Sequence, residues 1–284
     1  MIATTGFFDG VHCGHRLVTE RLVSLARERG DESLVVTFWP HPRAVLQDDA
    51  RELRLLSTLE EKKARLKMLG VDRVEVLDFT RAFASLTAEE YLRDVLQGRF
   101  GVTTLIVGYD NRLGSDRLTA SSLKPIAEGL GMELVELEPY GGISSTKIRN
   151  ALKKGDVEKA EEMLGYRYSL TGAVVAGNRL GRTIGFPTAN MRLYEPLKLV
   201  PGGGVYAVDV DVLGRRFRGM TNIGTKPTVG GTYVTIETHI LDFDEDIYGL
   251  PLTVTFLRRL RDEVRFPSLD ALKAQLEKDR EACR

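Results

Sequence analysis

The sequence has few cysteines, an even balance of charge and no long apolar run, and each of these absences excludes a class of protein. Cys13 and Cys283 are the only cysteines among 284 residues, which is too few for a disulfide framework and predicts a reducing, cytoplasmic setting. No apolar run is long enough to span a membrane, and Met1 leads directly into a short apolar segment, so we expect no signal peptide. The 40 basic residues are matched by 40 acidic ones, which argues against binding to nucleic acid or to an anionic membrane.

The composition is otherwise that of an ordinary globular protein, with 43% apolar and 28% charged residues. A chain of this length can bury two cores, so we expect two domains. Because there is no overall excess of charge, small anions would have to be bound by local sites. The chain contains neither a Walker A nor a GxGxxG motif, and Cys13 and Asp9 fit none of the usual zinc-ligand patterns.

The first half of the chain, up to about Gly165, alternates expected strands with expected helices. Residues 33–38 form a continuous apolar run, which is typical of a parallel strand covered on both faces. The repeated units predict an α/β domain with a doubly wound parallel sheet, in which ligands bind beyond the carboxyl ends of the strands. The expected strands are residues 1–5, 33–38, 74–79, 103–107 and 132–137, and the expected helices are residues 15–29, 57–70, 87–96, 118–130, 145–154 and 156–164.

The second half changes to short alternating segments separated by glycine-containing connections, without helices between them. This pattern predicts an antiparallel barrel or sandwich, and we favour a barrel followed by a terminal helix over residues 269–281. The expected strands are residues 169–176, 204–212, 217–223, 234–241 and 252–260. We place the domain boundary near Gly165, giving domains of residues 1–165 and 166–284.

Residues 6–15 read GFFDGVHCGH and contain the first candidate site. They lie between a strand and a helix expected to start at His15, where free backbone N–H groups and the helix dipole attract phosphate. Gly10 and Gly14 allow close approach of a ligand, and the rings of His12 and His15 could donate hydrogen bonds to one anion. The segment favours a phosphate cradle, with a structural turn as the alternative.

Residues 143–149 read ISSTKIR and offer a second anion site. Hydroxyl groups at an expected helix start, on Ser144, Ser145 and Thr146, are followed by Lys147 and Arg149. From these residues alone, an ordinary serine cap remains the alternative.

The second half carries a glycine-rich segment, residues 172–190, that ends in PTAN. The glycines alone favour a plain hairpin. Thr188 and Asn190 are two apart on an extended segment, so their oxygen atoms point to one side and suit Mg²⁺. In residues 235–239, strand alternation places Glu237 and His239 on the face opposite Ile236, where a solvent-facing glutamate is the simpler interpretation.

Together these motifs resemble those of the bacterial bifunctional riboflavin kinase / FMN adenylyltransferase family (FAD synthetases), over nearly the whole chain. Residues 6–15 match the HxGH motif of nucleotidyltransferases, residues 143–149 match the family's ISSTxxR motif, and residues 187–190 match the PTAN motif of riboflavin kinases. Residues 108–114 are similar to a glycine-flanked loop that faces the flavin nucleotide, and residues 260–266 to a loop that closes over flavin.

The resemblance implies roles for individual residues. It makes Glu237 the general base of the kinase, His12 and His15 catalytic in adenylyl transfer, and Thr188 and Asn190 the metal ligands. The implied flavin-binding residues are Asp110, Arg112, Arg261 and Phe266. The implied nucleotide-binding residues are Gly6, Asp9, His12, Gly14, His15, Ser144, Ser145, Thr146, Arg149, Gly177, Arg182 and Gly185.

The chemistry that the resemblance implies has two steps. Riboflavin and ATP give FMN and ADP in the C-terminal domain, and FMN and ATP give FAD and pyrophosphate in the N-terminal domain, with Mg²⁺ on the phosphates and no protein nucleophile. The expected partners are the small molecules riboflavin, FMN and ATP, without nucleic acid or membrane. The sequence does not indicate an oligomeric state.

Three positions depart from the family's usual pattern: Trp39 stands where an acidic residue is common, and Asn111 and Leu113 where aromatic residues or histidine are. One alternative is therefore a riboflavin kinase with a degenerate N-terminal nucleotide-binding domain. A flavin-responsive regulatory protein is a second alternative, but it would not need Glu237. A pantetheine- or glycerol-type cytidylyltransferase shares HxGH and leaves the second half unexplained.

Overall fold

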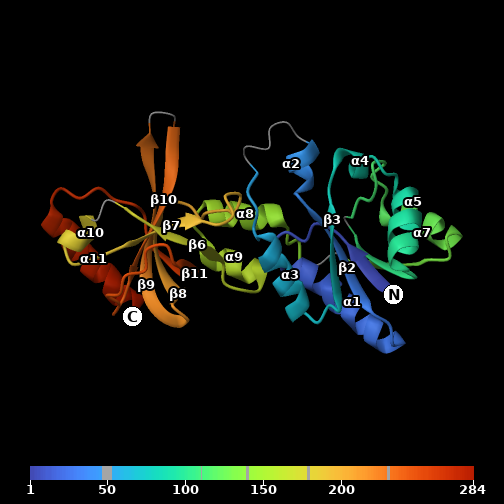
Figure 1. The fold of residues 1–284 in the computed structure, drawn as a ribbon, viewed down its shortest axis with the longest axis horizontal. Coiled ribbons are helices and arrows are strands. Elements are labelled where there is room, and N and C mark those ends of the chain that lie inside the picture. The colour runs from blue at the N-terminus through green and yellow to red at the C-terminus, as the bar shows by residue number, and fades with distance from the viewer. Residues whose placement is uncertain (47–52, 110, 139–140, 178–179, 229–230) are drawn as a thin grey trace. The chain divides into compact units, whose positions relative to one another are not determined.

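The computed structural model describes residues 1–46, 53–109, 111–138, 141–177, 180–228 and 231–284. The chain divides into two compact units, Met1–Ser145 and Thr146–Arg284. Figure 1 shows a sheet flanked by helices in the first unit and a barrel of strands in the second. Among the helices of the described residues, none has the length and apolarity needed to cross a membrane.

The first unit is built on a five-stranded parallel sheet with the order β3-β2-β1-β4-β5, which confirms the doubly wound fold. After β3 the chain crosses back over β1 to form β4, so the direction of winding reverses between β1 and β4. Ligands of such sheets bind beyond the carboxyl ends of the strands at this point. The strands are β1 (Ile2–Thr5), β2 (Ser33–Trp39), β3 (Arg73–Asp78), β4 (Thr104–Gly108) and β5 (Glu133–Leu137).

Two apolar clusters cover the two faces of this sheet. Ala3, Leu34 and Leu105 face one cluster, whereas Ile2 and Ile106 face the other. Burial on both faces explains why these strands read as continuous apolar runs. The helices and helical turns of this unit are α1 (Cys13–Arg29), α2 (Pro42–Leu46), α3 (Leu59–Met68), α4 (Arg81–Ala84), α5 (Ala88–Glu90), the π-helix η2 (Tyr91–Gln97), α6 (Gly98–Phe100) and α7 (Ala120–Gly129).

Helices α1 and α3 each begin two residues away from the start that the sequence predicts. Helix α1 begins at Cys13 rather than His15, because extended His12 caps it and its Nδ1 accepts a hydrogen bond from the backbone N–H of His15 at 3.3 Å. Helix α3 begins at Leu59 rather than at residue 57, because a capping box of Thr58 and Glu61 starts it. The Ser57 hydroxyl is occupied elsewhere, since it accepts a hydrogen bond from the N–H of Gly10.

The second unit is a closed antiparallel barrel with the order β10-β7-β6-β11-β8-β9, so the barrel prediction is confirmed over the sandwich. Helix α9 packs against strand β11. The sequence did not predict β7, because Pro187 and the polar Thr188 and Asn190 interrupt the alternation of apolar and polar residues that is typical of a strand. The elements are α8 (Ser145–Lys153), α9 (Val157–Leu164), β6 (Ser169–Val175), α10 (Leu180–Thr183), β7 (Ala189–Leu193), β8 (Gly204–Val212), β9 (Arg215–Thr228), β10 (Gly231–Ile240), β11 (Pro251–Arg261) and α11 (Leu269–Cys283).

Candidate functional site

The loop after β1 brings two histidine rings together at the start of α1. The rings of His12 and His15 stack with centroids 3.7 Å apart and an interplanar angle of 14°. Burial lowers the pKa of His15 well below its usual value, and the nearby His12 and Lys62 lower it further. Among the described residues, the Nδ1 of His15 is one of the few buried side-chain atoms without a hydrogen-bond partner. This arrangement leaves polar ring atoms available beside the N-terminus of a helix.

A first cavity of about 250 Å³ opens at this loop. It joins the two motifs that the sequence singled out in the first unit, since six residues of segment 6–15 and all of residues 143–145 line it. The Ser145 hydroxyl donates to the backbone carbonyl of Asp9 at 3.1 Å, which fixes the two segments to each other. Thr146 and Arg149 follow Ser145 on α8 and belong to the second unit. The expected site residues that line the cavity are Gly6, His12, Gly14, His15, Ser144 and Ser145.

Asp9 does not line this cavity. Its buried carboxylate accepts hydrogen bonds from the backbone N–H groups of Leu56, at 2.9 Å, and Ser57, at 3.1 Å. The side chain therefore ties the histidine loop to the segment that leads into α3. The structure places the expected nucleotide-binding Asp9 behind the site, as a support for the loop.

A second, larger cavity of about 540 Å³ lies next to the first, and five aromatic side chains are among the residues that line it. Four residues line both cavities: Thr5, Gly6, Phe7 and Asn111. Arg112 and Leu113 line the larger cavity, whereas Trp39 does not, and Asp110 lies outside the described residues. The larger cavity also contains Phe38, Phe79, Phe83 and Tyr91. Two cavities that share a wall can hold two substrates with their reacting ends together.

Strands β7 and β10 bring the candidate kinase residues together in the second unit. Glu237 pairs with Asn190 in the register of these strands. A Cβ atom at Gly177 would lie 2.2 Å from Nδ2 of Asn190, so the side chain of Asn190 occupies space that only glycine leaves open. The glycine-rich segment is therefore shaped around Asn190 and is more than a plain hairpin. Gly185 has a φ of +87° and nothing near its Cβ position, so it serves the turn before β7.

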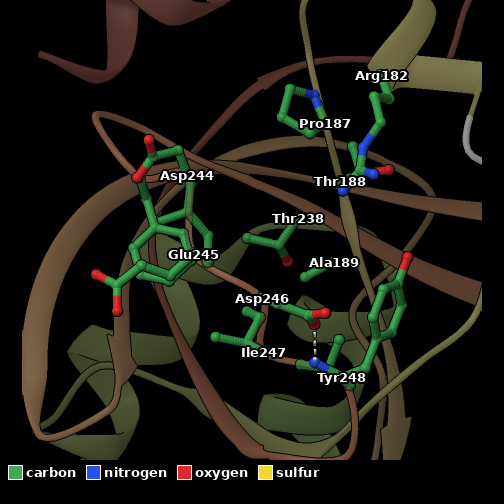
Figure 2. Close-up of a pocket in the computed structure, with 13 residues that line it drawn as sticks. Arg182, Pro187, Thr188, Ala189, Thr238, Asp244, Glu245, Asp246, Ile247 and Tyr248 are labelled. Carbon is green, nitrogen blue, oxygen red and sulfur yellow. Dashed lines mark hydrogen bonds between the residues drawn. The ribbon is translucent and has the colours of Figure 1, made fainter.

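Two cavities of the barrel also share a wall. One, of about 320 Å³, is lined by Glu237, Asn222, Arg261 and Phe266, with His239 beside them. The other, of about 310 Å³, is lined by Arg182 and residues 243–248. Thr188 lines both. Figure 2 shows Arg182 and Thr188 on one side of the second cavity, with Asp244 and Glu245 across from them.

The comparisons with known proteins agree with this geometry. A family model described as "FAD synthetase" matches residues 1–151, and one described as "Riboflavin kinase" matches residues 164–284. The "Bifunctional riboflavin kinase/FMN adenylyltransferase" of Escherichia coli (strain K12) is 40% identical over 284 residues, which cover 98% of this chain and 90% of that protein. The chain belongs to this bifunctional riboflavin kinase/FMN adenylyltransferase family.

Two further relatives extend the match. The protein of the same name from Bacillus subtilis (strain 168) is 36% identical over 289 residues, covering 99% of this chain and 90% of that protein. A crystal structure described as "Macrolide-efflux Protein from Streptococcus pneumoniae" is 35% identical, with a TM-score of 0.93 over 100% of this chain and 93% of the other. The bifunctional family therefore spans both units.

Three side chains of this family member were given no role from the sequence. Lys62 is fully buried beside the histidine loop, and the Nδ1–H of His239 donates a hydrogen bond to the carbonyl oxygen of Pro187 at 2.8 Å. Asp279 of α11 binds the guanidinium of Arg261, with Oδ2 2.7 Å from an Nη atom. The strand alternation already placed His239 on the same face as Glu237. Lys62 and Asp279 could not be recognised in this way, because each lies in a helix with many other charged residues.

Proposed function

We propose that this chain phosphorylates riboflavin with ATP in its barrel and then transfers the adenylyl group of a second ATP to FMN in its N-terminal unit. Residues 1–165 and 166–284 would be the adenylyltransferase and kinase domains. The observation that carries the proposal is that each unit has two cavities meeting at a shared wall, with the candidate reactive residues there. The two family models, each matching one half, support the same assignment.

In the proposed kinase reaction, riboflavin occupies the cavity lined by Arg261 and Phe266, and ATP the neighbouring cavity at Arg182. Gly177 and Gly185 shape the chain around the nucleotide. Glu237 takes the proton from the 5′-hydroxyl of riboflavin as that oxygen attacks the γ-phosphorus, and ADP leaves. The shared wall at Thr188 sets where the hydroxyl and the γ-phosphate meet.

An ATP-dependent kinase and adenylyltransferase imply a divalent metal ion, and we propose Mg²⁺. The described residues contain no group of three or more His, Cys, Asp or Glu side chains that could hold a metal ion alone. Thr188 and Asn190 instead offer two hard oxygen atoms, which fits Mg²⁺ because this ion is usually held by few protein groups and the substrate phosphates. When bound there, Mg²⁺ would neutralise charge on the phosphates.

In the proposed adenylyl transfer, ATP occupies the cavity at His12 and His15, and the isoalloxazine ring of FMN the aromatic cavity. The FMN phosphate attacks the α-phosphorus of ATP in line, and pyrophosphate leaves. The histidines and the hydroxyl of Ser145 donate hydrogen bonds to the phosphates. Catalysis then consists of positioning and charge stabilisation, without a covalent intermediate.

A kinase with an inactive N-terminal domain is the second candidate, since Asn111 and Leu113 depart from the family pattern. Against it, Leu113 is buried and still gives the aromatic cavity an apolar wall, and Asn111 is held by a hydrogen bond from its Nδ2 to the carbonyl of Thr5 at 3.3 Å. Both departures are therefore accommodated in an intact site. We also propose that the enzyme acts in the cytoplasm, with small molecules as its partners.

The test is a time course of the purified protein with ATP and Mg²⁺, started from riboflavin in one tube and from FMN in another, with flavins separated by chromatography. The proposal expects FMN before FAD in the first tube and FAD in the second. FMN accumulating without FAD would support the kinase-only candidate. Riboflavin bound without any product would support a regulatory protein.

A further inference from the structure

Lys62 is a buried cation that the reaction as described above does not use. It lies on α3 with no exposed surface, although the helix is otherwise strongly charged and the side chain of its neighbour Lys63 is 42% exposed. The Nζ of Lys62 lies 3.6 Å from the centroid of the Phe7 ring and donates to the hydroxyl of Thr37 at 3.3 Å. That hydroxyl donates in turn to the backbone carbonyl of Phe7 at 3.2 Å. Lys62 thus fixes Phe7 through both its ring and its backbone.

Phe7 is one of the four residues that line both cavities of the first unit, whereas Lys62 lines neither. The ammonium group therefore sits behind the wall at which the two cavities meet. The charged and titratable groups that act on this region are Asp9, which interacts favourably with Lys62, and His15, whose protonation Lys62 opposes. The ring of His12 stacks on that of His15.

Packing alone does not explain this lysine. Burial lowers the pKa of Lys62 to about 8, which shows that its charged form is held against a desolvation penalty. An apolar side chain of similar length would fill the same space without that penalty. A positive charge in a poorly hydrated place acts over several ångströms on nearby negative charge, because little solvent screens it.

We propose that Lys62 is a positioning residue for adenylyl transfer, whose buried ammonium holds Phe7 in place and stabilises negative charge where the phosphates of the two substrates meet. This inference rests on the proposed function of the first unit. In this proposal, the charge of Lys62 acts on the substrates from behind the wall between the cavities, in addition to the histidines that face the substrate. Stabilisation of the phosphates requires a positive charge at position 62 as well as a side chain of the right length.

The test compares Lys62→Met, which keeps the length and removes the charge, with Lys62→Arg, which keeps the charge. In the full chain we expect Lys62→Met to lower kcat for FAD formation from FMN by roughly 10- to 100-fold with KM for FMN changed less than 3-fold, and Lys62→Arg to recover much of the loss. Riboflavin phosphorylation by the same preparations is expected to be unchanged and controls for enzyme concentration, while urea unfolding of each variant controls for folding. A Lys62→Met variant with wild-type kcat for FAD formation would overturn the inference.

A pH profile provides a readout that also works if Lys62→Met folds poorly. We expect wild-type kcat/KM for FMN to fall above pH of about 8, because deprotonation of Lys62 removes the charge, and Lys62→Arg to keep its rate there. The same alkaline loss in both proteins would contradict the role of Lys62. Failure of the proposed function itself is distinguishable, since wild-type protein would then form no FAD at any pH.

Discussion

The imidazole rings of His12 and His15 lie nearly parallel, with their centroids 3.7 Å apart. Two rings at this distance cannot both carry a proton without strong repulsion, and burial already disfavours a charge on His15. In the absence of substrate, His15 is therefore neutral at pH 7. Bound phosphates would reverse this preference, because they stabilise the protonated ring.

The lowered pKa of His15 predicts a loss of stability in acid. Because the unfolded chain binds a proton near pH 6.5 and the folded chain binds it only at lower pH, the free energy of unfolding falls as the pH drops from about 6.5 toward the lowered pKa. The loss from this one group is up to about 1.4 kcal/mol per pH unit. We expect His15→Gln to lose less stability than wild type between pH 7 and pH 5, measured by urea unfolding. Equal losses in the two proteins would contradict the assignment.

The buried ion pair of Arg261 and Asp279 joins the end of β11 to the terminal helix. The Asp279 side chain is 4% exposed and also accepts from Gln275, so Asp279→Asn leaves Arg261 without its counter-charge in a poorly hydrated place. We expect this variant to lose about 3 kcal/mol of unfolding free energy and to raise KM for riboflavin, since Arg261 lines the cavity.

A matched surface pair controls for the charge change. Arg216 and Asp211 are 2.8 Å apart but 67% and 37% exposed, so Asp211→Asn is expected to change stability by less than about 1 kcal/mol. Urea unfolding of the two variants side by side measures the difference. Similar losses of unfolding free energy in the two variants would show that the Arg261–Asp279 pair contributes no more to stability than an exposed pair.

The contact between Gly177 and Asn190 predicts a defect confined to the kinase. In Gly177→Ala the new methyl group would lie 2.2 Å from Nδ2 of Asn190 and must displace that side chain. We expect a fall in riboflavin phosphorylation of about 10-fold or more and a higher Mg²⁺ concentration for half-maximal rate. FAD formation from FMN should not change.

Gly129→Ala is the control for this substitution. Gly129 ends α7 in the first unit, and nothing lies within 4 Å of its Cβ position. We expect both activities to remain at wild-type values. A Gly177→Ala enzyme with an unchanged Mg²⁺ requirement would show that the position of Asn190 does not matter for the metal.

The sequence predicted most of the fold where burial controls the pattern. Residues 33–38 were recognisable as a strand because both faces of the sheet are covered, which leaves only apolar residues. Strand β7 was missed because Pro187 cannot donate a backbone hydrogen bond and polar residues follow it. The start of α1 was missed because histidine is an uncommon cap, so that the capping role of His12 is visible only in the structure.

The candidate site could be predicted only in part. The segments that carry His12, Ser145, Thr188 and Glu237 contain local motifs, and each of these side chains lines a cavity. Lys62 could not be found in this way, because Lys62 and Lys63 are adjacent in a charged helix and only tertiary burial and the contact with Phe7 distinguish them. Tertiary contacts between distant segments have no local signature.

The central claim is that one chain contains two independent sites, and mixing two complementary variants tests it most directly. Glu237→Gln should lose at least about 100-fold in FMN formation from riboflavin but still convert FMN to FAD, and His15→Ala should do the reverse. Neither variant alone should make FAD from riboflavin at an appreciable rate, whereas the mixture should, because FMN released by one enters the other. Loss of both activities in a folded Glu237→Gln protein, or no FAD from the mixture, would contradict the two-site account.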